Sequence, residues 1–299
     1  MLAVVKSWKG KKTEHSMEAL YNLIGRSRQS MSQIKKRQKS KLEKEVNLVK
    51  CVRTIRANHS RMGSRVIYHK LKNPQMGITA FEKMMSSHGL TIPIRKRRII
   101  TTQTDRKRRY PNLINSLVLN RINQLVVGDI TYYKSGMETY YIFSLKDHYS
   151  GRIVGLTGDT NMEGDKALEC LFQMSILRRI GTFEDLIHHT DGGGQYRSDD
   201  YLNWLGSENI KISQSENCLE NGCAEQLNGV VKNDYLENHD VKDVKDLRKV
   251  LKKIKHWINY DRPVAKLGYR TPVNFEEHIE SMPEQERPQF KLYDFKEER

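Results

Sequence analysis

The sequence predicts an α/β fold in which a mixed five-stranded sheet, flanked by helices, follows an all-helical basic region. Three observations lead to this prediction. Runs of β-branched and aromatic residues, separated by turn residues, begin near residue 124. Beyond residue 160, helical periodicity alternates with short apolar runs. The whole excess of positive charge lies before residue 111, which sets the N-terminal part of the chain apart.

The composition limits the class of protein. The chain has 299 residues, 29% charged and 37% hydrophobic, with a formal net charge of +16. This length supports packed cores in about two domains, and the charge favours a polyanionic partner over a small metabolite. No stretch approaches the roughly 18 apolar residues of a membrane span, and Met1–Val5 is too short for a secretory signal. We therefore expect an intracellular protein with no membrane partner.

Cysteine usage agrees with a reducing compartment. The chain has four cysteines, too few and too scattered for a disulfide framework. Cys218 and Cys223 resemble half of a zinc site, but no second closely spaced Cys or His pair accompanies them. We expect the thiols to be buried or inert.

The N-terminal region is strongly basic. Residues 1–110 contain 28 Lys and Arg but only 6 Asp and Glu, whereas the remaining residues contain 24 and 30. A one-sided basic block predicts contact with DNA or RNA, because each neutralised phosphate releases counterions. The alternative is a solubilising tail.

Apolar spacing organises this block into helices. Leu48, Val52 and Ile55 share one helical face, and glycines 63 and 77 lie at the expected breaks, so three short helices are predicted between residues 45 and 90. Such an arrangement is compatible with a helix-turn-helix module. We assign residues 1–91 to a basic, helical DNA-binding region.

Residues 92–118 form the expected linker. This segment has no apolar period and contains a dense run of cations, namely Arg95, Lys96, Arg97 and Arg98. We expect these side chains to follow a phosphate backbone.

The core elements follow in a recognisable order. Strands are expected over 125–133, 139–147 and 152–160, with the turn residues of an antiparallel meander between them. The later elements are a helix over 162–179, a strand ending at 191, a helix over 198–208, a strand over 210–213 and a helix over 221–236. This is the order of ribonuclease H-like folds. We assign the core to residues 119–240.

A C-terminal helix and extension complete the chain over residues 241–299. Leu247, Val250, Leu251 and Ile254 have the spacing of one helical face. Such a face more often packs on a core than forms a groove for a partner.

Three acidic residues form the candidate site. Asp129 lies inside an apolar strand, where burial of an unpaired carboxylate is costly. Asp191 follows another strand, and Glu225 shares a face of the late helix with Gly229 and Lys232. If the first and fourth strands are neighbours, as the fold requires, the three carboxylates converge.

Converging carboxylates repel one another unless cations neutralise them, and hard oxygen ligands select Mg²⁺ or Mn²⁺. Two ions per active site, roughly 3.5–4 Å apart, would activate a water or a 3′-hydroxyl and stabilise the leaving oxygen. The acidic residues therefore predict phosphodiester chemistry on nucleic acid.

At these residues the sequence closely resembles bacterial insertion-sequence transposases, specifically the second-reading-frame (OrfB-type) protein with a retroviral-integrase-like DDE catalytic core. The matching motifs are GDITYY around Asp129, HTDGGGQY around Asp191, and NGCAEQLNGVVKNDYL around Glu225. YDRP and LGYRTP resemble the family's tail, RMGSRVIYHKL its second helix-turn-helix segment, and YPNLI its linker. Seven pieces in the family's order make accidental similarity improbable.

The resemblance implies roles for individual residues. Asp129, Asp191 and Glu225 would be the catalytic, metal-binding triad. The expected DNA contacts are Gln195, Tyr196, Asn221 and Lys232 near the active site and Arg65 in the helix-turn-helix segment. Lys232 has an alternative role as an intrahelical ion-pair partner.

The resemblance also implies a reaction and partners. Hydrolytic nicking at an element end would free a 3′-hydroxyl that attacks a second phosphodiester bond. The implied partners are DNA, as element ends and as target, and an upstream-frame transposase protein, possibly as a frameshift fusion. Pairing two ends implies a homo-oligomer on DNA in the bacterial cytoplasm, associated with the nucleoid. A nuclease of the same fold and a decayed transposase that only binds DNA are the alternatives.

We expect structural rather than catalytic roles for other polar residues. Asp147 and Asp159 end strands in turns, where Asp bonds local backbone. Asp199 and Asp200 suit a helix N-terminus, and Asp234 points away from Glu225 on the same helix. His188 and His189 alternate along a strand, so only one of them could approach the acidic residues.

Overall fold

The computed structural model describes residues 16–72, 74–93, 109–179, 183–215 and 222–292. The predicted DNA contacts Arg95, Lys96, Arg97, Arg98 and Asn221 lie outside these ranges, as does Cys218. The chain divides into two compact units. The first comprises Met1–Ile55 and Pro74–Leu90, and the second comprises Arg56–Asn73 and Thr91–Arg299. We describe each unit by itself.

The first unit is helical. It contains α2 (Met17–Leu23), α5 (Ile78–Ser87) and most of α3 (Arg28–Asn58). The α2 helix begins where the Ser16 side chain accepts a hydrogen bond from the Ala19 N–H. The α3 helix is longer than the apolar spacing predicted, and it buries only Met31, Val49 and Val52 along its 31 residues. The chain from 28 to 58 contains no Gly or Pro that would end it sooner.

The predicted breaks occur at the expected glycines. Gly63 caps α4 (Ser64–Lys70), and Gly77 caps α5. The α5 helix turns Phe81, Met84 and Met85 inward. The two breaks and the short helices α4 and α5 confirm the prediction, whereas the first of the three expected short helices is part of the long α3.

Residues 56–73 belong to the second unit, although their sequence pattern grouped them with residues 1–91. The His59 ring lies 2.8 Å from the Tyr235 hydroxyl and 2.6 Å from an Asp261 carboxylate oxygen. The His69 ring stacks on Tyr269 with centroids 3.5 Å apart. These contacts are not visible from local spacing, because the partners lie far apart in the sequence.

The second unit is built on a mixed five-stranded sheet in the order β4-β3-β2-β5-β6. Its strands are β2 (Leu125–Ser135), β3 (Glu138–Asp147), β4 (Ile153–Asp159), β5 (Ile187–Thr190) and β6 (Lys211–Gln214). The first three pair antiparallel, whereas β5 runs parallel to both β2 and β6. This topology is that of ribonuclease H-like folds and confirms the predicted fold class.

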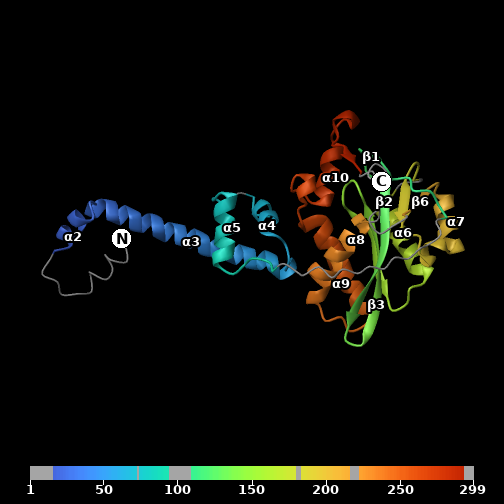
Figure 1. Ribbon diagram of the computed structural model, residues 1–299, viewed down its shortest axis with the longest axis horizontal. Helices are drawn as coiled ribbons and strands as arrows, with labels where there is room; N and C mark the ends of the chain where they lie inside the picture. Colours follow the sequence, from blue (N-terminus) through green and yellow to red (C-terminus); the bar gives the residue numbers. More distant parts are fainter. Residues whose placement is uncertain (1–15, 73, 94–108, 180–182, 216–221, 293–299) are drawn as a thin grey trace, which may run out of the picture. The chain divides into compact units, whose positions relative to one another are not determined.

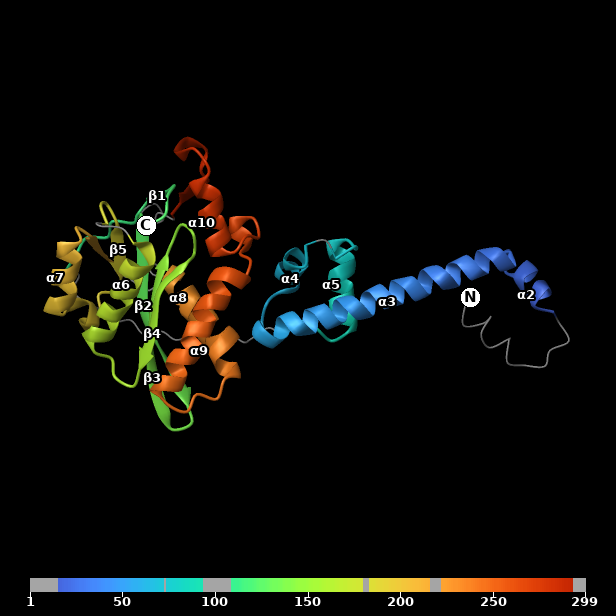
Figure 2. The same ribbon diagram turned by 180° about the vertical axis from the view of Figure 1, so that it is seen from behind.

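Helices cover both faces of this sheet, as the two opposite views in Figures 1 and 2 show. On one face lie α6 (Gly164–Arg178) and α7 (Asp199–Ser207), which share a hydrophobic cluster with Phe143 and Leu145. On the other lie α8 (Gly222–Gly229) and α9 (Val244–His256). The apolar face of α9 is buried there, as predicted, against Tyr140 and Ile142.

The late helix changes character along its length. After α8 the chain continues as a wider π-helical segment over Val230–Tyr235, then as a 3₁₀ turn over Leu236–Asn238. The described part of the expected helix over 221–236 is therefore helical, but its second half is π-helical rather than α-helical. Tyr235 is fully buried and stacks on Trp257, so tertiary packing fixes this part of the backbone.

The C-terminal extension is tied to the core. A second π-helical segment (Trp257–Asp261) and a 3₁₀ turn (Ala265–Leu267) lead into α10 (Pro272–Glu280), and a 3₁₀ turn (Glu284–Glu286) follows it. The short strands β1 (Val118–Leu119) and β7 (Phe290–Lys291) pair with each other. These strands were not predicted, because two residues carry no alternation signal.

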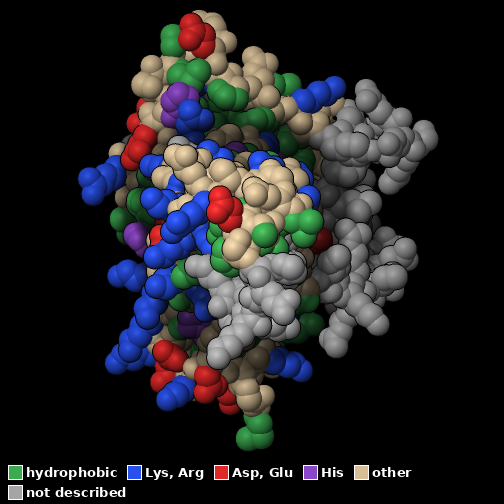
Figure 3. Space-filling model, turned by 90° about the vertical axis from the view of Figure 1, so that its left-hand side faces the viewer, with side chains coloured by type: hydrophobic (Ala, Val, Ile, Leu, Met, Phe, Trp, Pro, Cys, Tyr) green, Lys and Arg blue, Asp and Glu red, His purple; other side chains and the backbone are tan. Residues whose placement is uncertain are grey.

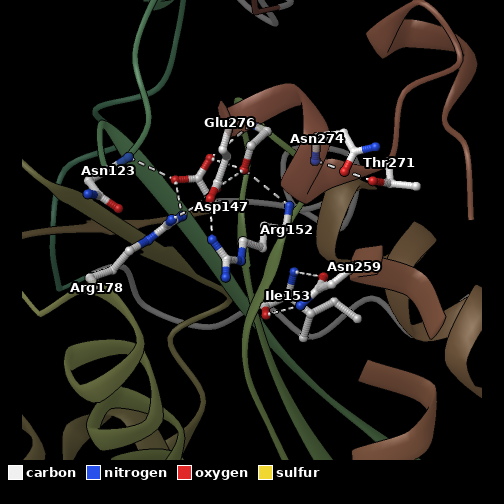
Figure 4. Close-up of polar contacts among 10 residues, drawn as sticks. Asn123, Asp147, Arg152, Ile153, Arg178, Asn259, Thr271, Asn274 and Glu276 are labelled. Carbon is white, nitrogen blue, oxygen red and sulfur yellow. Dashed lines mark hydrogen bonds and ion pairs between the residues drawn. The ribbon is translucent and has the colours of Figure 1, made fainter. Parts of the chain in front are cut away.

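A buried ionic network joins α10 to the sheet (Figure 4). Arg178 on α6 lies 2.8 Å from Glu276 and 3.1 Å from Asp147. Arg152 also pairs with Glu276, and the Ser150 hydroxyl donates to the same carboxylate at 2.7 Å. Two carboxylates and two guanidinium groups thus offset one another's burial.

Within the described ranges, no helix has both the length and the apolar character needed to cross a membrane.

Candidate active site

The strand register brings two of the predicted acidic residues together. Strands β2 and β5 run parallel, with Val127 opposite His189. Two residues further along, Asp129 lies within β2 and Asp191 directly follows the end of β5, so the register places the two residues next to each other. The negative charge of Asp191 is close enough to raise the pKa of Asp129. The first and fourth strands are neighbours, as the predicted convergence of the carboxylates required.

Glu225 reaches the same place from the first turn of α8. It lines a cavity of about 250 Å³ together with Asp129 and Lys232. The other lining residues are Thr131, Asn228, Gly229 and Asn233. Glu225, Gly229 and Lys232 therefore share one face, as their spacing predicted, and this face looks toward β2.

The electrostatics of Asp129 reflect this crowding. Burial, the charge of Asp191 and the more weakly acting Glu225 raise its pKa to about 7, while hydrogen bonds from the Ile130 N–H and Asn228 oppose the shift. Desolvation also raises the pKa of Glu225. Near neutral pH, the Asp129 carboxyl group is therefore only partly ionised in the absence of a counter-charge.

The donor set fits a hard divalent cation. Carboxylate oxygens are the ligands that Mg²⁺ and Mn²⁺ prefer, and a cation would relieve the repulsion that raises the pKa of Asp129. The carboxylates do not form a closed ligand cage. In the part of the chain that the structure describes, no three Asp, Glu, His or Cys side chains converge as tightly as a finished metal site would require.

Asn228 is a site residue that the sequence analysis missed. Its side-chain amide donates to an Asp129 carboxylate oxygen at 2.8 Å, and its own oxygen accepts from the Ser144 hydroxyl at 2.9 Å. Asn228 is buried, so this chain of bonds fixes the Asp129 carboxylate. Its position three residues after Glu225 was the available signal, because residues at i and i+3 share a helix face.

Lys232 is the cation of the cavity. Its ammonium lies 4.3 Å from the centroid of the half-exposed Tyr132 ring. No ion pair within 4.0 Å is formed by Lys232 with the described carboxylates. Its placement beside Glu225 suits a phosphate contact.

The other predicted DNA contacts have different environments. Gln195 is half-buried and Tyr196 is buried in a 3₁₀ turn (Gly194–Arg197) that follows Asp191. The ring centroids of Tyr196 and Tyr201 lie 5.7 Å apart, and both rings belong to the hydrophobic cluster that α6 and α7 share with the sheet. Arg65 is exposed on α4.

Both histidines beside Asp191 form hydrogen bonds with core residues, and their side chains point to different sides of the strand. His188 lies 2.6 Å from the Tyr201 hydroxyl, and His189 lies 2.8 Å from the Ser213 hydroxyl. Burial lowers the pKa of each to about 4. Both rings therefore act as neutral hydrogen-bonding groups of the core.

The remaining acidic residues are structural, as expected. Asp147 is fully buried and pairs with Arg178, and Asp159 pairs with Arg248 at 2.9 Å. Asp199 and Asp200 lie in the first turn of α7. Asp234 pairs with Arg262 at 2.9 Å, away from the cavity.

Comparison with protein families gives two matches, both described as the integrase core domain. One profile matches residues 120–217 and the other matches residues 207–272. Together these matches cover the five-stranded sheet, all three acidic residues and the chain as far as the start of α10.

Curated relatives match a little under half of the chain. An uncharacterized 31 kDa protein of insertion element IS600 from Shigella sonnei is 29% identical over 141 residues, which are 46% of this chain and 51% of the relative. A putative transposase of element IS986/IS6110 from Mycobacterium tuberculosis is 26% identical over 136 residues, 44% of this chain and 49% of the relative. The chain thus spans about half the length of these relatives.

Among solved structures, the chain is similar to the HTLV-2 integrase catalytic core domain in complex with magnesium. The identity is 20% and the TM-score is 0.42, over 55% of this chain and 99% of the other.

Proposed function

We propose, from the premise that residues 120–272 belong to the integrase core domain family, that this protein is a DNA transposase of a bacterial insertion sequence. Its reaction is metal-dependent nicking at element ends, followed by attack of the freed 3′-hydroxyl on a second phosphodiester bond. The observation that carries the proposal is the approach of three acidic residues from separate elements: Asp129 and Glu225 line one cavity, and Asp191 is close enough for its charge to raise the pKa of Asp129.

Divalent ions held by Asp129, Asp191 and Glu225, two per site, would supply the Lewis acidity that activates the attacking oxygen and stabilises the leaving one. The chain's own residues prepare this site. Asn228 orients the Asp129 carboxylate through its 2.8 Å hydrogen bond. Lys232, on the same wall, contributes positive charge toward a phosphate.

The loop after Asp191 holds its carboxylate in place. The Gly193 N–H donates to Asp191 at 2.9 Å, and Gly192 adopts φ +69°, a conformation that favours glycine. A side chain at Gly192 would also meet the Gln214 side chain at 2.4 Å. The first glycine of the GGG run is therefore needed for the backbone conformation of this loop and for its close approach to Gln214.

DNA is the proposed partner, as element ends and as target. In the first unit, Lys36, Arg37, Lys41 and Lys44 line one groove of about 510 Å³ along α3. Lys and Arg side chains also gather on the face drawn in Figure 3. These cations supply the sequence-independent part of binding.

Further partners belong to the same proposal. Synapsis of two element ends calls for a homo-oligomer on DNA, and an upstream-frame transposase protein, as a partner or frameshift fusion, would recognise the ends. The expected location is the bacterial cytoplasm, at the nucleoid.

The experiment incubates the protein with labelled DNA flanking its gene in Mg²⁺ or Mn²⁺ and maps nicked and joined strands. Glu225→Gln should abolish both products, whereas Glu184→Gln, a matched change before the opposite end of β5, should preserve them. Nicks without joined strands would identify a nuclease instead. If no protein gives nicked or joined strands, not even a fusion to the upstream-frame protein, but DNA binding is retained, the protein is a decayed transposase.

A further inference from the structure

The outer face of α9 is a cationic surface that the catalytic site does not use. Lys245, Lys249 and Lys252 are exposed and recur at helical spacing, so they form one stripe on the helix. The stripe extends about 10 Å along the axis at 1.5 Å per residue. The opposite face of the helix is buried in the hydrophobic cluster with Leu247 and Leu251, which fixes the direction in which the lysines point.

These lysines have no carboxylate partner in the described part of the chain. Among the described residues, Lys245, Lys249, Lys252 and the adjacent Lys253 make no ion pair within 4.0 Å. By contrast, Lys211 in the same unit pairs with Asp185 at 2.6 Å. The acidic residues on α9 itself, Asp243 and Asp246, lie at its N-terminal end, where Asp243 caps the helix.

The stripe borders an open hollow on the helix surface. This hollow of about 510 Å³ is lined by Val244, Lys245, Arg248, Lys249 and Lys252. Arg248 is the one lining cation with partners, because it bonds to Asp159 at 2.9 Å and to the Gly158 carbonyl oxygen. Arg248 thereby anchors the middle of the stripe to β4, and the lysines on either side remain available to a ligand.

The cluster of positive charge on α9 differs from the rest of residues 111–299. Residues 111–299 carry more acidic than basic side chains, yet the exposed face of α9 is almost purely cationic. Folding does not require it, since an isolated run of like charges repels itself. A fixed row of unpaired ammonium groups is complementary to a row of phosphates.

We infer that the outer face of α9 binds the phosphate backbone of duplex DNA outside the catalytic cavity. The inference rests on the proposed function, because that function makes DNA the polyanion. The α8 and α9 helices cover the same face of the sheet and share one hydrophobic cluster through Leu227 and Leu247. DNA that reaches Glu225 on α8 extends beyond the cavity, and α9 gives its backbone a second, sequence-independent contact.

The test is the salt dependence of DNA binding by the full chain. Lys245→Gln/Lys249→Gln/Lys252→Gln should lower the slope of log Kobs against log[salt] by about 2–3, because each phosphate that a lysine neutralises adds about 0.9 to the slope. The control Arg179→Gln/Lys211→Gln/Lys291→Gln removes the same charge outside α9 and should leave the slope nearly unchanged. All six side chains are exposed, so an unchanged Tm verifies folding.

An α9 variant with the slope of the unsubstituted protein would overturn the inference. The inference would also be overturned if the α9 variant changed its oligomeric state, measured by light scattering, but kept its slope. The lysine face would then bind a second copy of the protein rather than DNA. If the inference holds, loss of nicking assigns the contact to element ends, and loss of joining alone assigns it to target DNA. Failure of the catalytic proposal is distinct: Glu225→Gln and the unsubstituted protein would then give the same products while the α9 slope change persisted.

Discussion

At the scale of single residues, the proposed site depends on the electrostatics of Asp129. Its raised pKa means that the folded protein binds a proton more tightly than the unfolded chain does. Between pH 4 and pH 7 the unfolded state therefore carries the lower proton count, and the folded state loses stability as pH rises. The crowding that the proposed metal site requires at Asp129 therefore lowers the stability of the metal-free fold.

Asp129→Asn should stabilise the metal-free protein at pH 8 by up to about 4 kcal/mol, because about three pKa units of unfavourable ionisation are removed. At pH 4 the gain should vanish, since the carboxyl is then protonated in the fold. Urea unfolding with EDTA at both pH values measures this. Equal effects at pH 4 and pH 8 would contradict the assigned pKa, and Glu184→Gln serves as the neutral comparison.

Asn228→Ala should reduce metal-dependent nicking by about 10- to 100-fold, the usual cost of removing a partner that orients a metal ligand. Removal of the amide donor should also raise the pKa of Asp129, because its hydrogen bond lowers it now. The acidic limb of the pH–rate profile should therefore move to higher pH. A uniform loss of rate with an unmoved profile would show that Asn228 contributes only to packing.

At the scale of elements, the close packing of strand β4 on helix α6 leaves no room at Gly155. A Cβ there would lie 2.5 Å from the Cys170 carbonyl oxygen. Gly155→Ala should cost about 1–3 kcal/mol, as overpacked cores do. Gly206→Ala on α7 meets nothing within 4 Å and should stabilise by up to about 1 kcal/mol. Equal midpoints for both variants in urea would contradict this packing.

The network around Glu276 links another pair of elements, α10 and the sheet. Glu276→Gln should destabilise by about 3–5 kcal/mol, because Arg178 and Arg152 would remain buried with incomplete pairing. Arg178 and Arg152 hold the pKa of Glu276 below its usual value. Its contribution to stability is therefore present above about pH 4.5 and lost as pH falls further.

Thermal unfolding between pH 3 and pH 7 tests this dependence. Glu277→Gln, an exposed neighbour on α10, should unfold like the unsubstituted protein. A Glu276→Gln protein that keeps the full acid sensitivity would show that other carboxylates cause it.

Elements with strong local signals were predictable from the sequence. The three meander strands, the two glycine breaks and the amphipathic α9 were predicted because period and turn residues identify them. The sequence did not predict the π-helical segment after α8 or the pairing of β1 with β7. Their conformations depend on Tyr235 packing and on pairing across the chain, which no local pattern encodes.

At the scale of the whole molecule, the least predictable feature is the membership of residues 56–73 in the second unit. The site itself was largely predictable, since the fold class dictates that the strands of Asp129 and Asp191 are neighbours. Asn228 was missed because its role depends on a bond to Ser144 across the sheet. The placement of His59 depends likewise on Tyr235 and Asp261, which lie 176 and 202 positions later in the sequence.

His59→Ala should destabilise the second unit by about 1–3 kcal/mol, because the buried Tyr235 hydroxyl loses a partner. Burial lowers the pKa of His59, so the fold holds it neutral and loses stability as pH falls below about 6.5. The variant should be less sensitive to pH between 5 and 7 in thermal unfolding. The exposed His278→Ala provides the control; matching pH dependence in all three proteins would refute the assignment.

The central claim is that Asp129, Asp191 and Glu225 act together as a site for divalent ions. Titration calorimetry with Mn²⁺ at pH 8 tests it most directly, on the full chain without DNA. We predict binding that Asp129→Asn and Glu225→Gln each weaken by tenfold or more and that Glu184→Gln leaves intact. Equal Mn²⁺ affinity in all four proteins would contradict it.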